Sequence, residues 1–121
     1  MKRIALVEDN ADNRLLVQAI LEGAYQVDEY ESGPEALAAL RAGVPPDLVL
    51  LDISLPGMDG VQVLREIRGT ASLAGLPVVA LTAHAMAGDR ERYLALGFDD
   101  YVTKPIVDES VLLGALAGLI G

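Results

Sequence analysis

The stretch from Asp47 to Gly60, DLVLLDISLPGMDG, places the strongest constraint on how this chain can fold. Its four consecutive apolar residues, Leu48 to Leu51, predict a strand buried on both faces, as in the centre of a parallel sheet. The strand ends on a carboxylate, Asp52, and the Pro and Gly residues that follow predict a sharp turn. Ligands of open α/β sheets bind beyond the carboxyl ends of the strands, so the pattern places Asp52 where a functional site is expected.

Short apolar segments alternate with helical patterns along the whole chain. Strands are predicted over residues 3–7, 26–30, 48–51, 78–81 and 100–102. Helices are predicted to end near residues 23, 41, 69 and 96, with a last helix from about residue 108 onward. Such alternation favours parallel strands joined by right-handed crossovers. We therefore predict an α/β fold, a doubly wound five-stranded parallel sheet flanked by five helices, in one domain over residues 1–121.

Helix starts and apolar faces are also marked in the sequence. Asn10 or Asp12 predicts the N-cap of the first helix, and the Ser-Gly-Pro-Glu sequence from Ser32 predicts a capping-box start for the second. Two helices are predicted to bury one apolar face each, comprising Leu15, Leu16, Ala19 and Ile20 in the first helix and Val111, Leu112, Ala115, Leu116 and Leu119 in the last.

The excess of acidic over basic residues limits the kinds of ligand that the chain can bind. Nine Lys and Arg stand against 18 Asp and Glu, and the formal net charge of −9 would repel a phosphate backbone, which predicts against direct nucleic-acid binding. The chain has no Cys, which rules out disulfides, thiolate catalysis and Cys-ligated metals. No apolar run approaches the roughly 20 residues of a membrane span, so we expect a cytoplasmic protein with no membrane partner.

Polar residues that can serve chemistry follow four of the five predicted strands. Glu8 and Asp9 follow the first, Asp52 the third, Thr82 the fourth, and Lys104 lies just past the last. The carboxyl ends of parallel strands meet at one edge of a sheet, so these side chains can converge. Carboxylates without His or Cys suit a hard cation, Mg²⁺ before Ca²⁺ or Zn²⁺. A lysine and a hydroxyl beside that cation would bind phosphoryl oxygens, which predicts a Mg²⁺-dependent phosphoryl site with an aspartate nucleophile.

Each of these residues also has an ordinary structural interpretation. Asp52 alone is more simply a turn residue, and Glu8 with Asp9 could be an acidic helix start. Thr82 could be a strand-end hydroxyl and Lys104 a surface charge. Only the combination of all five favours a chemical role over these interpretations.

Four segments, in this order, resemble the receiver domains of two-component response regulators. They are VEDN at residues 7–10, LLDISLPGMDG at 50–60, ALTAHAM at 80–86 and YVTKPI at 101–106. The resemblance covers essentially the whole chain from Ile4 to the last helix. The residues in the matching segments are most similar to those of DivK-like single-domain regulators and of receivers of hybrid histidine kinases. It implies a flavodoxin-like sheet with strand order 2-1-3-4-5.

The resemblance implies a role for each matching residue at the metal and phosphoryl site. Asp52 would be the phosphoacceptor, and Mg²⁺ would be the cofactor. The metal ligands would be Glu8, Asp9, Asp52 and the backbone carbonyl of Ser54, with Asp9 the more direct of the acidic pair. Thr82 and Lys104 would bind phosphoryl oxygens.

Further residues would, by the same resemblance, control the switch and its lifetime. Tyr101 would turn inward after Thr82 moves, although a tyrosine at this place could also be simple packing. Ser54 and His84, two positions past the phosphoacceptor and the threonine, would tune the rate at which the phosphoryl group is lost. His84 is the only histidine, and an exposed side chain at the rim of the site is its simpler interpretation. A cis peptide bond is implied between Lys104 and Pro105.

The implied function is that of a phosphorylation-controlled signalling switch rather than a metabolic enzyme. A histidine kinase or a histidine phosphotransfer protein would present phosphohistidine to Asp52, and the chain would catalyse only its own phosphorylation and dephosphorylation. The fourth helix, fifth strand and fifth helix would form the surface that binds a downstream protein target or a second copy of the chain. The sequence has neither leader nor trailing linker, so we expect a stand-alone protein.

Three other classes of protein have to be weighed against this one. A phosphohydrolase with an aspartate nucleophile would place a second acid where this chain has Ser54, and would usually carry a cap domain for which there is no room. A flavin or nucleotide module would need a Gly-rich turn after the first strand, where EDNADN is acidic. A pseudo-receiver that works without phosphorylation is disfavoured by the intact acidic residues, and metal-dependent phosphorylation would separate it from a receiver.

Overall fold

The computed structural model describes residues 1–83 and 88–121, in which strands and helices alternate as predicted. The strands are β1 (Arg3–Val7), β2 (Gln26–Tyr30), β3 (Leu48–Asp52), β4 (Val78–Thr82) and β5 (Asp100–Thr103). The helices are α1 (Ala11–Leu21), α2 (Gly33–Ala42), α3 (Gly60–Gly69), α4 (Asp89–Leu96) and α5 (Glu109–Ile120). The start predicted for the fourth helix, at Met86, lies outside the described residues.

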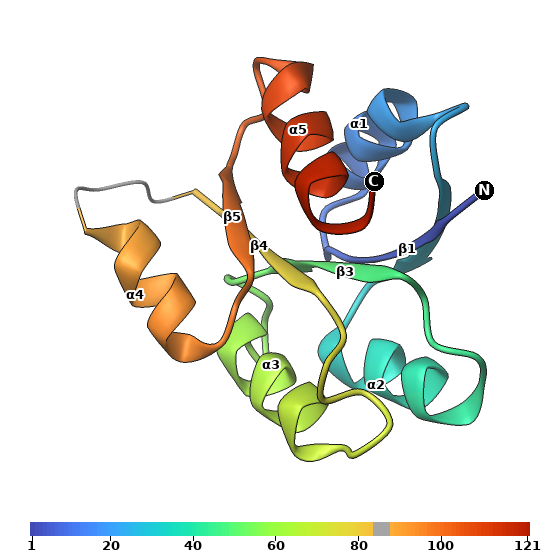
Figure 1. The fold of residues 1–121 in the computed structure, drawn as a ribbon, viewed down its shortest axis with the longest axis vertical. Helices are drawn as coiled ribbons and strands as arrows, with labels where there is room; N and C mark the ends of the chain where they lie inside the picture. The colour runs from blue at the N-terminus through green and yellow to red at the C-terminus, as the bar shows by residue number, and fades with distance from the viewer. Residues whose placement is uncertain (84–87) are drawn as a thin grey trace.

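All strands pair in parallel in the order β2-β1-β3-β4-β5 (Figure 1). The predicted fold class and strand order are therefore confirmed. Every residue of β3 and β4 is buried, as expected for the central strands of a sheet covered on both faces, whereas β2 at the edge is partly exposed. Parallel pairing brings the carboxyl ends of β1, β3, β4 and β5 to the same edge of the sheet.

Two apolar cores lie on opposite faces of the sheet, because successive side chains of a strand alternate between its faces. One core packs α2, α3 and Tyr93 of α4 against Ala5, Val7 and their neighbours on β3 and β4. The other packs α1 and α5 against Ile4, Leu6 and their neighbours. Figure 1 shows these layers, with α1 and α5 above the sheet and α2 and α3 below it.

The N-termini of α1, α2 and α3 are capped by side chains. Asn10 is the N-cap of α1, for which the sequence offered either Asn10 or Asp12. At the start of α2, the Ser32 hydroxyl accepts a hydrogen bond from the N–H of Glu35. A full capping box, which was not predicted, joins Asp59 and Gln62 at α3. It fixes α3 directly after the loop that follows Asp52.

The apolar faces predicted for α1 and α5 are partly wrong. Leu15, Leu16 and Ala19 are exposed, Leu15 by 71%, because α1 turns the stripe of Val17, Ile20 and Leu21 toward the sheet. In α5 nearly every residue is apolar, so helical spacing alone could not select a face. Leu112 and Leu116 are buried as predicted and Ala115 is half-buried, but Val111 is 51% exposed and Leu119 lies on the surface. No helix in the part of the chain that the structure describes is long and apolar enough to span a membrane.

Candidate functional site

Three carboxylates meet at the carboxyl edge of the sheet, and we call them the acidic cluster: Glu8, Asp9 and Asp52. Glu8 and Asp9 directly follow β1, and Asp52 is the last residue of β3. One carboxylate oxygen from each lies within 4.8 Å of the others. Glu8 and Asp52 are buried and Asp9 is exposed, so the cluster opens to solvent on the Asp9 side.

The ammonium group of Lys104 lies against the two buried carboxylates. Its Nζ donates a hydrogen bond to Glu8 Oε1 at 2.9 Å and lies 3.2 Å from Asp52 Oδ1. Lys104 follows β5, and its backbone N–H donates to the carbonyl of Thr82, which ties the residue to the end of β4. The Lys104–Pro105 peptide bond is cis, as the resemblance implied. The positive charge of Lys104 partly compensates the charge that Glu8 and Asp52 bring into the protein interior.

Burial raises the pKa of Glu8, and the hydrogen bond and negative charge of Asp52 raise it further, although Lys104 opposes the shift. Burial lowers the pKa of Lys104, but the hydrogen bond that its ammonium donates to Glu8 and the negative charges of both carboxylates more than offset this, and its pKa is raised. The acidic cluster therefore holds more negative charge than one lysine satisfies, which favours the binding of a further cation.

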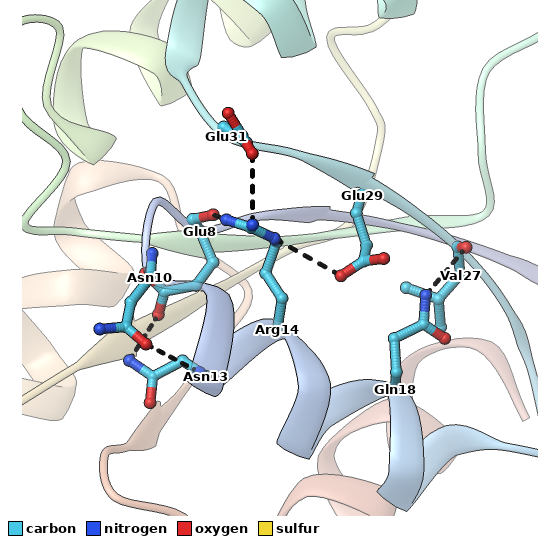
Figure 2. Close-up of polar contacts among 8 residues, drawn as sticks. All are labelled: Glu8, Asn10, Asn13, Arg14, Gln18, Val27, Glu29 and Glu31. Atoms are coloured by element: carbon cyan, nitrogen blue, oxygen red, sulfur yellow. Dashed lines mark hydrogen bonds and ion pairs between the residues drawn. The ribbon is translucent and has the colours of Figure 1, made fainter.

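Residues of α1 hold Glu8 in place (Figure 2). Asn13 Nδ2 donates to Glu8 Oε1 at 3.2 Å, and the backbone N–H of Asn10 donates to Oε2 at 3.3 Å. Arg14 donates to the carbonyl oxygen of Glu8 at 2.8 Å and forms an ion pair with Glu31 on the β2 side at 3.3 Å. None of these α1 side chains was predicted to belong to the site, because their contacts with Glu8 depend on how α1 docks beside β1.

Asp52 is held by the backbone that follows it. Its Oδ1 accepts the N–H of Ser54 at 3.0 Å, and the N–H of Gly60 donates to the carbonyl of Ile53. At Gly60 there is no space for a side chain, since a Cβ would lie 2.4 Å from the Asp52 carbonyl oxygen and 2.8 Å from Ile53 Cα. The glycine thus lets α3 begin directly against the end of β3, and this contact sets the backbone position of Asp52.

A second group of side chains lies at the ends of β4 and β5, and we call it the hydroxyl–aromatic cluster: Thr82, Tyr93 and Tyr101. Thr82 ends β4, one register position beyond the Asp52–Leu81 pair. Its Oγ1 lies 3.0 Å from the hydroxyl oxygen of Tyr93 on α4, a buried hydrogen bond. The rings of Tyr93 and Tyr101 are tilted with centroids 5.6 Å apart. Tyr101, the predicted switch, is half-buried.

The structure brings some of the predicted site residues together, and one of them lies outside the part that it describes. The structure brings together Glu8, Asp9, Asp52 and Lys104, and it places Ser54 beside Asp52. His84 lies outside the described residues. Tyr93 was not predicted to belong to the site, although a single tyrosine in the otherwise polar first half of α4 is a signal for a buried hydroxyl contact.

The donor set fits a hard divalent cation. The acidic cluster offers carboxylate oxygens alone, the ligands that Mg²⁺ prefers, and its exposed side leaves room for the water ligands that Mg²⁺ retains.

Residues 4–117 match the model of the response regulator receiver domain, and the chain belongs to this family. It is thus a receiver domain of two-component phosphorelay signalling, a class of signalling switch rather than of classical enzyme. Receiver domains interact with histidine kinases or phosphotransfer proteins, and they typically bind Mg²⁺ at an acidic pocket.

Similar proteins include both hybrid kinases and small regulators. The chain is 45% identical over 114 residues to sensor protein GacS of Pseudomonas syringae, covering 90% of this chain but only 12% of GacS. It is 40% identical over 106 residues to the polar-differentiation response regulator DivK of Brucella ovis, covering 87% of this chain and 85% of DivK.

Among solved structures, the receiver domain of sensor histidine kinase PA1611 from Pseudomonas aeruginosa is similar over 99% of this chain and 98% of that one. It has a TM-score of 0.87 and 36% identity, and its active site cleft contains a coordinated magnesium ion.

Proposed function

We propose that the chain is a Mg²⁺-dependent phosphoacceptor in which Asp52 receives a phosphoryl group from phosphohistidine. The observation that carries the proposal is the position of the Lys104 ammonium, 3.2 Å from Asp52 Oδ1, with Glu8 and Asp9 beside them. A nucleophilic carboxylate, a fixed positive charge and a set of metal-binding oxygens are the parts that phosphoryl transfer to an aspartate needs.

In the proposed step, a carboxylate oxygen of Asp52 attacks phosphorus in line with the bond to the histidine nitrogen. The new O–P bond forms while the P–N bond breaks, and the bonding electron pair stays on the imidazole. The proton on the other ring nitrogen keeps the departing imidazole neutral. Lys104, and Thr82 through its hydroxyl, bind oxygens of the transferred group and stabilise the charge that it carries.

The proposed metal ligands are Glu8, Asp9, Asp52 and the backbone carbonyl of Ser54. Bound Mg²⁺ would neutralise charge on the transferring phosphoryl group. Asp9 is the exposed member of the acidic cluster, which suits a ligand that meets an incoming hydrated ion.

The proposed output surface is the face made by α4, β5 and α5. Attraction of Thr82 to the phosphoryl group, followed by inward rotation of Tyr101, would shift the population of this face between two states. An open groove of about 470 Å³ lies there, lined in part by Arg90, Tyr101 and Val111. The occupant would be a downstream protein or a second copy of the chain, and sedimentation of the phosphorylated form that does not change with concentration would exclude the dimer.

The chain would also catalyse phosphorylation from small donors and hydrolysis of its own acyl phosphate. Ser54 and His84 are proposed to tune that hydrolysis, and an unchanged rate in His84→Ala would remove His84 from the account. A cytoplasmic location is part of the proposal, because the chain would meet there the histidine kinase or phosphotransfer protein that donates the phosphoryl group.

The experiment that tests the proposal measures intact mass after incubation with acetyl phosphate, with and without Mg²⁺. We expect wild type to gain one phosphoryl group only with Mg²⁺, and Asp52→Asn to gain none. Asp12→Asn, which removes an exposed carboxylate of α1, is the matched control and should be phosphorylated like wild type. Phosphorylation of Asp52→Asn, or of wild type without any divalent cation, would contradict the proposal.

A further inference from the structure

Tyr93 connects the candidate phosphoryl-binding residue Thr82 to the surface of α4. Thr82 Oγ1 and Tyr93 Oη are 3.0 Å apart, and both residues are buried, Tyr93 by all but 2%. From the other side, Arg92 Nη2 donates a hydrogen bond to Tyr93 Oη at 3.1 Å, and the Arg92 side chain is 60% exposed. A chain of polar contacts thus runs from solvent to the end of β4.

The chemistry of these groups favours one direction for the hydrogen bonds. A guanidinium can only donate, so Arg92 occupies a lone pair of the Tyr93 oxygen. The buried proton of the Tyr93 hydroxyl needs an acceptor. Among the described residues, Thr82 Oγ1 lies within hydrogen-bond distance and can accept it. When Tyr93 donates to Thr82, the Thr82 hydroxyl can itself donate to a further acceptor. Chained hydrogen bonds of this kind polarise one another, which makes the last donor stronger.

The Tyr93 ring is held from two sides. Phe98 contacts it edge to face with centroids 6.0 Å apart, and Tyr101 packs at 5.6 Å with a tilt of 44°. Arg92 also lies over the ring, with its Cζ 4.9 Å from the centroid. The Tyr93 hydroxyl therefore points at Thr82 from a fixed position. The Tyr93 ring also contacts Tyr101, the predicted switch residue.

We propose that Tyr93 is a positioning residue for phosphoryl transfer: its hydroxyl donates to Thr82 and directs the Thr82 proton toward a phosphoryl oxygen. Tyr93 does not contact the reacting atoms and acts through Thr82. The inference rests on the proposed function and adds to it a contact between α4 and the phosphoryl site.

The test compares Tyr93→Phe with wild type in the rate of phosphorylation by acetyl phosphate over a range of Mg²⁺ concentrations. The substitution removes the hydroxyl and keeps the ring. Loss of one hydrogen bond to the phosphoryl-binding donor should lower the maximal rate by about three- to tenfold. The Mg²⁺ concentration for half-maximal rate should stay the same, because Tyr93 does not touch the acidic cluster. A general structural defect would change both quantities.

A second comparison tests whether the effect passes through Thr82. In a Thr82→Val background the Tyr93 hydroxyl has lost its acceptor, so Tyr93→Phe should cause no further change. The matched control is Tyr25→Phe, which removes a hydroxyl before β2 at the other end of the sheet and should behave like wild type. If Tyr93→Phe does not fold, Arg92→Met, which removes the donor to Tyr93, should show a smaller loss in the same direction.

Three outcomes would overturn the inference. They are a Tyr93→Phe rate within twofold of wild type, an equal loss in the Thr82→Val background, and an equal loss for Tyr25→Phe. Each of them leaves the proposed function intact, since wild type is phosphorylated in all three. A wild-type chain that forms no adduct would instead overturn the proposed function, and with it the role of Tyr93.

Discussion

The acidic cluster and the hydroxyl–aromatic cluster lie at the same edge of the sheet, yet they are held by different forces. In the acidic cluster, the Lys104 ammonium pairs with two buried carboxylates, so charge is added there to the hydrogen bonds that hold Glu8 and Asp52. The hydroxyl–aromatic cluster contains no carboxylate or ammonium group. Thr82 and Tyr93 are held there by the contact between their hydroxyls and by the edge-to-face and tilted contacts of the Tyr93 ring.

The difference indicates that the two clusters have separate functions, a division of labour between metal binding and coupling to α4. Charges attract one another more strongly in a protein interior than in water. The carboxylates of the acidic cluster are therefore suited to bind a metal ion. Hydrogen bonds and ring contacts act over short distances and depend on orientation, so the hydroxyl–aromatic cluster is suited to transmit a local movement to α4. Variants in the first should change cation binding and stability, and variants in the second should change rates.

The largest effect on stability is expected from Lys104→Met. Without its ammonium, two buried carboxylates lose their compensating charge, and the free energy of unfolding without divalent cations should fall by about 3 kcal/mol. Mg²⁺ should stabilise the variant more than wild type, because no neighbouring ammonium repels the ion. Denaturant unfolding with and without Mg²⁺ measures both quantities. Arg65→Met, an exposed change of equal charge, is the control, and an equal loss there would contradict the account.

A somewhat smaller loss is expected from Gly60→Ala, which affects the acidic cluster through its backbone. The added Cβ would lie 2.4 Å from the Asp52 carbonyl oxygen, so α3 or the end of β3 has to move. We expect a loss of about 2–3 kcal/mol and slower phosphorylation of Asp52. Gly69→Ala, in the last turn of the same helix and with open space around it, should be neutral or slightly stabilising. Equal stability of the two variants would refute the close contact.

The pH dependence of stability should distinguish Glu8→Gln from wild type when no divalent cation is present. Burial and Asp52 raise the pKa of Glu8 above its ordinary 4.5, so its folded form favours the protonated acid. Such a group stabilises the fold below the pKa of the unfolded chain and loses this contribution as pH rises through its folded pKa. The variant does not titrate there and should gain stability relative to wild type over that pH window. Unfolding free energies measured from pH 4 upward check this, and a difference that shrinks with rising pH would contradict it.

The smallest effect is expected from Arg14→Met, next to the acidic cluster. The variant loses the hydrogen bond to the Glu8 carbonyl, at a cost of about 1 kcal/mol, and Mg²⁺ binding should weaken by about threefold as the Glu8–Asp9 backbone loosens. Arg41→Met breaks only an exposed ion pair with Glu66 and should cost less than about 0.5 kcal/mol without changing Mg²⁺ binding. Isothermal titration calorimetry and denaturant unfolding separate the two variants.

The sequence predicted the acidic cluster better than the hydroxyl–aromatic cluster, and the reason is topological. Glu8, Asp52 and Lys104 each lie at or just past the carboxyl end of a strand, and a parallel sheet brings these strand ends together whatever the details of packing. Tyr93 meets Thr82 only because of how α4 docks on the sheet, which no spacing within the helix encodes.

The same limit explains the errors in α1 and α5. Helical spacing identifies residues that share a face, but it does not say which of two adjacent apolar stripes meets the sheet. Leu15 lies beside the buried stripe of Val17, and Val111 beside that of Leu112. Helix boundaries were better predicted, because local signals such as the Ser32 cap and the positive-φ Gly97 determine them.

The division of labour is tested most directly by Mg²⁺ titration of two variants, Asp9→Asn and Thr82→Val, by calorimetry. The account predicts that Asp9→Asn weakens Mg²⁺ binding by at least about tenfold, because it removes the exposed carboxylate of the acidic cluster. Thr82→Val should bind Mg²⁺ within about twofold of wild type and differ only in the rate of phosphorylation. Equal weakening in both variants, or Mg²⁺ binding by Asp9→Asn as tight as in wild type, would contradict the account.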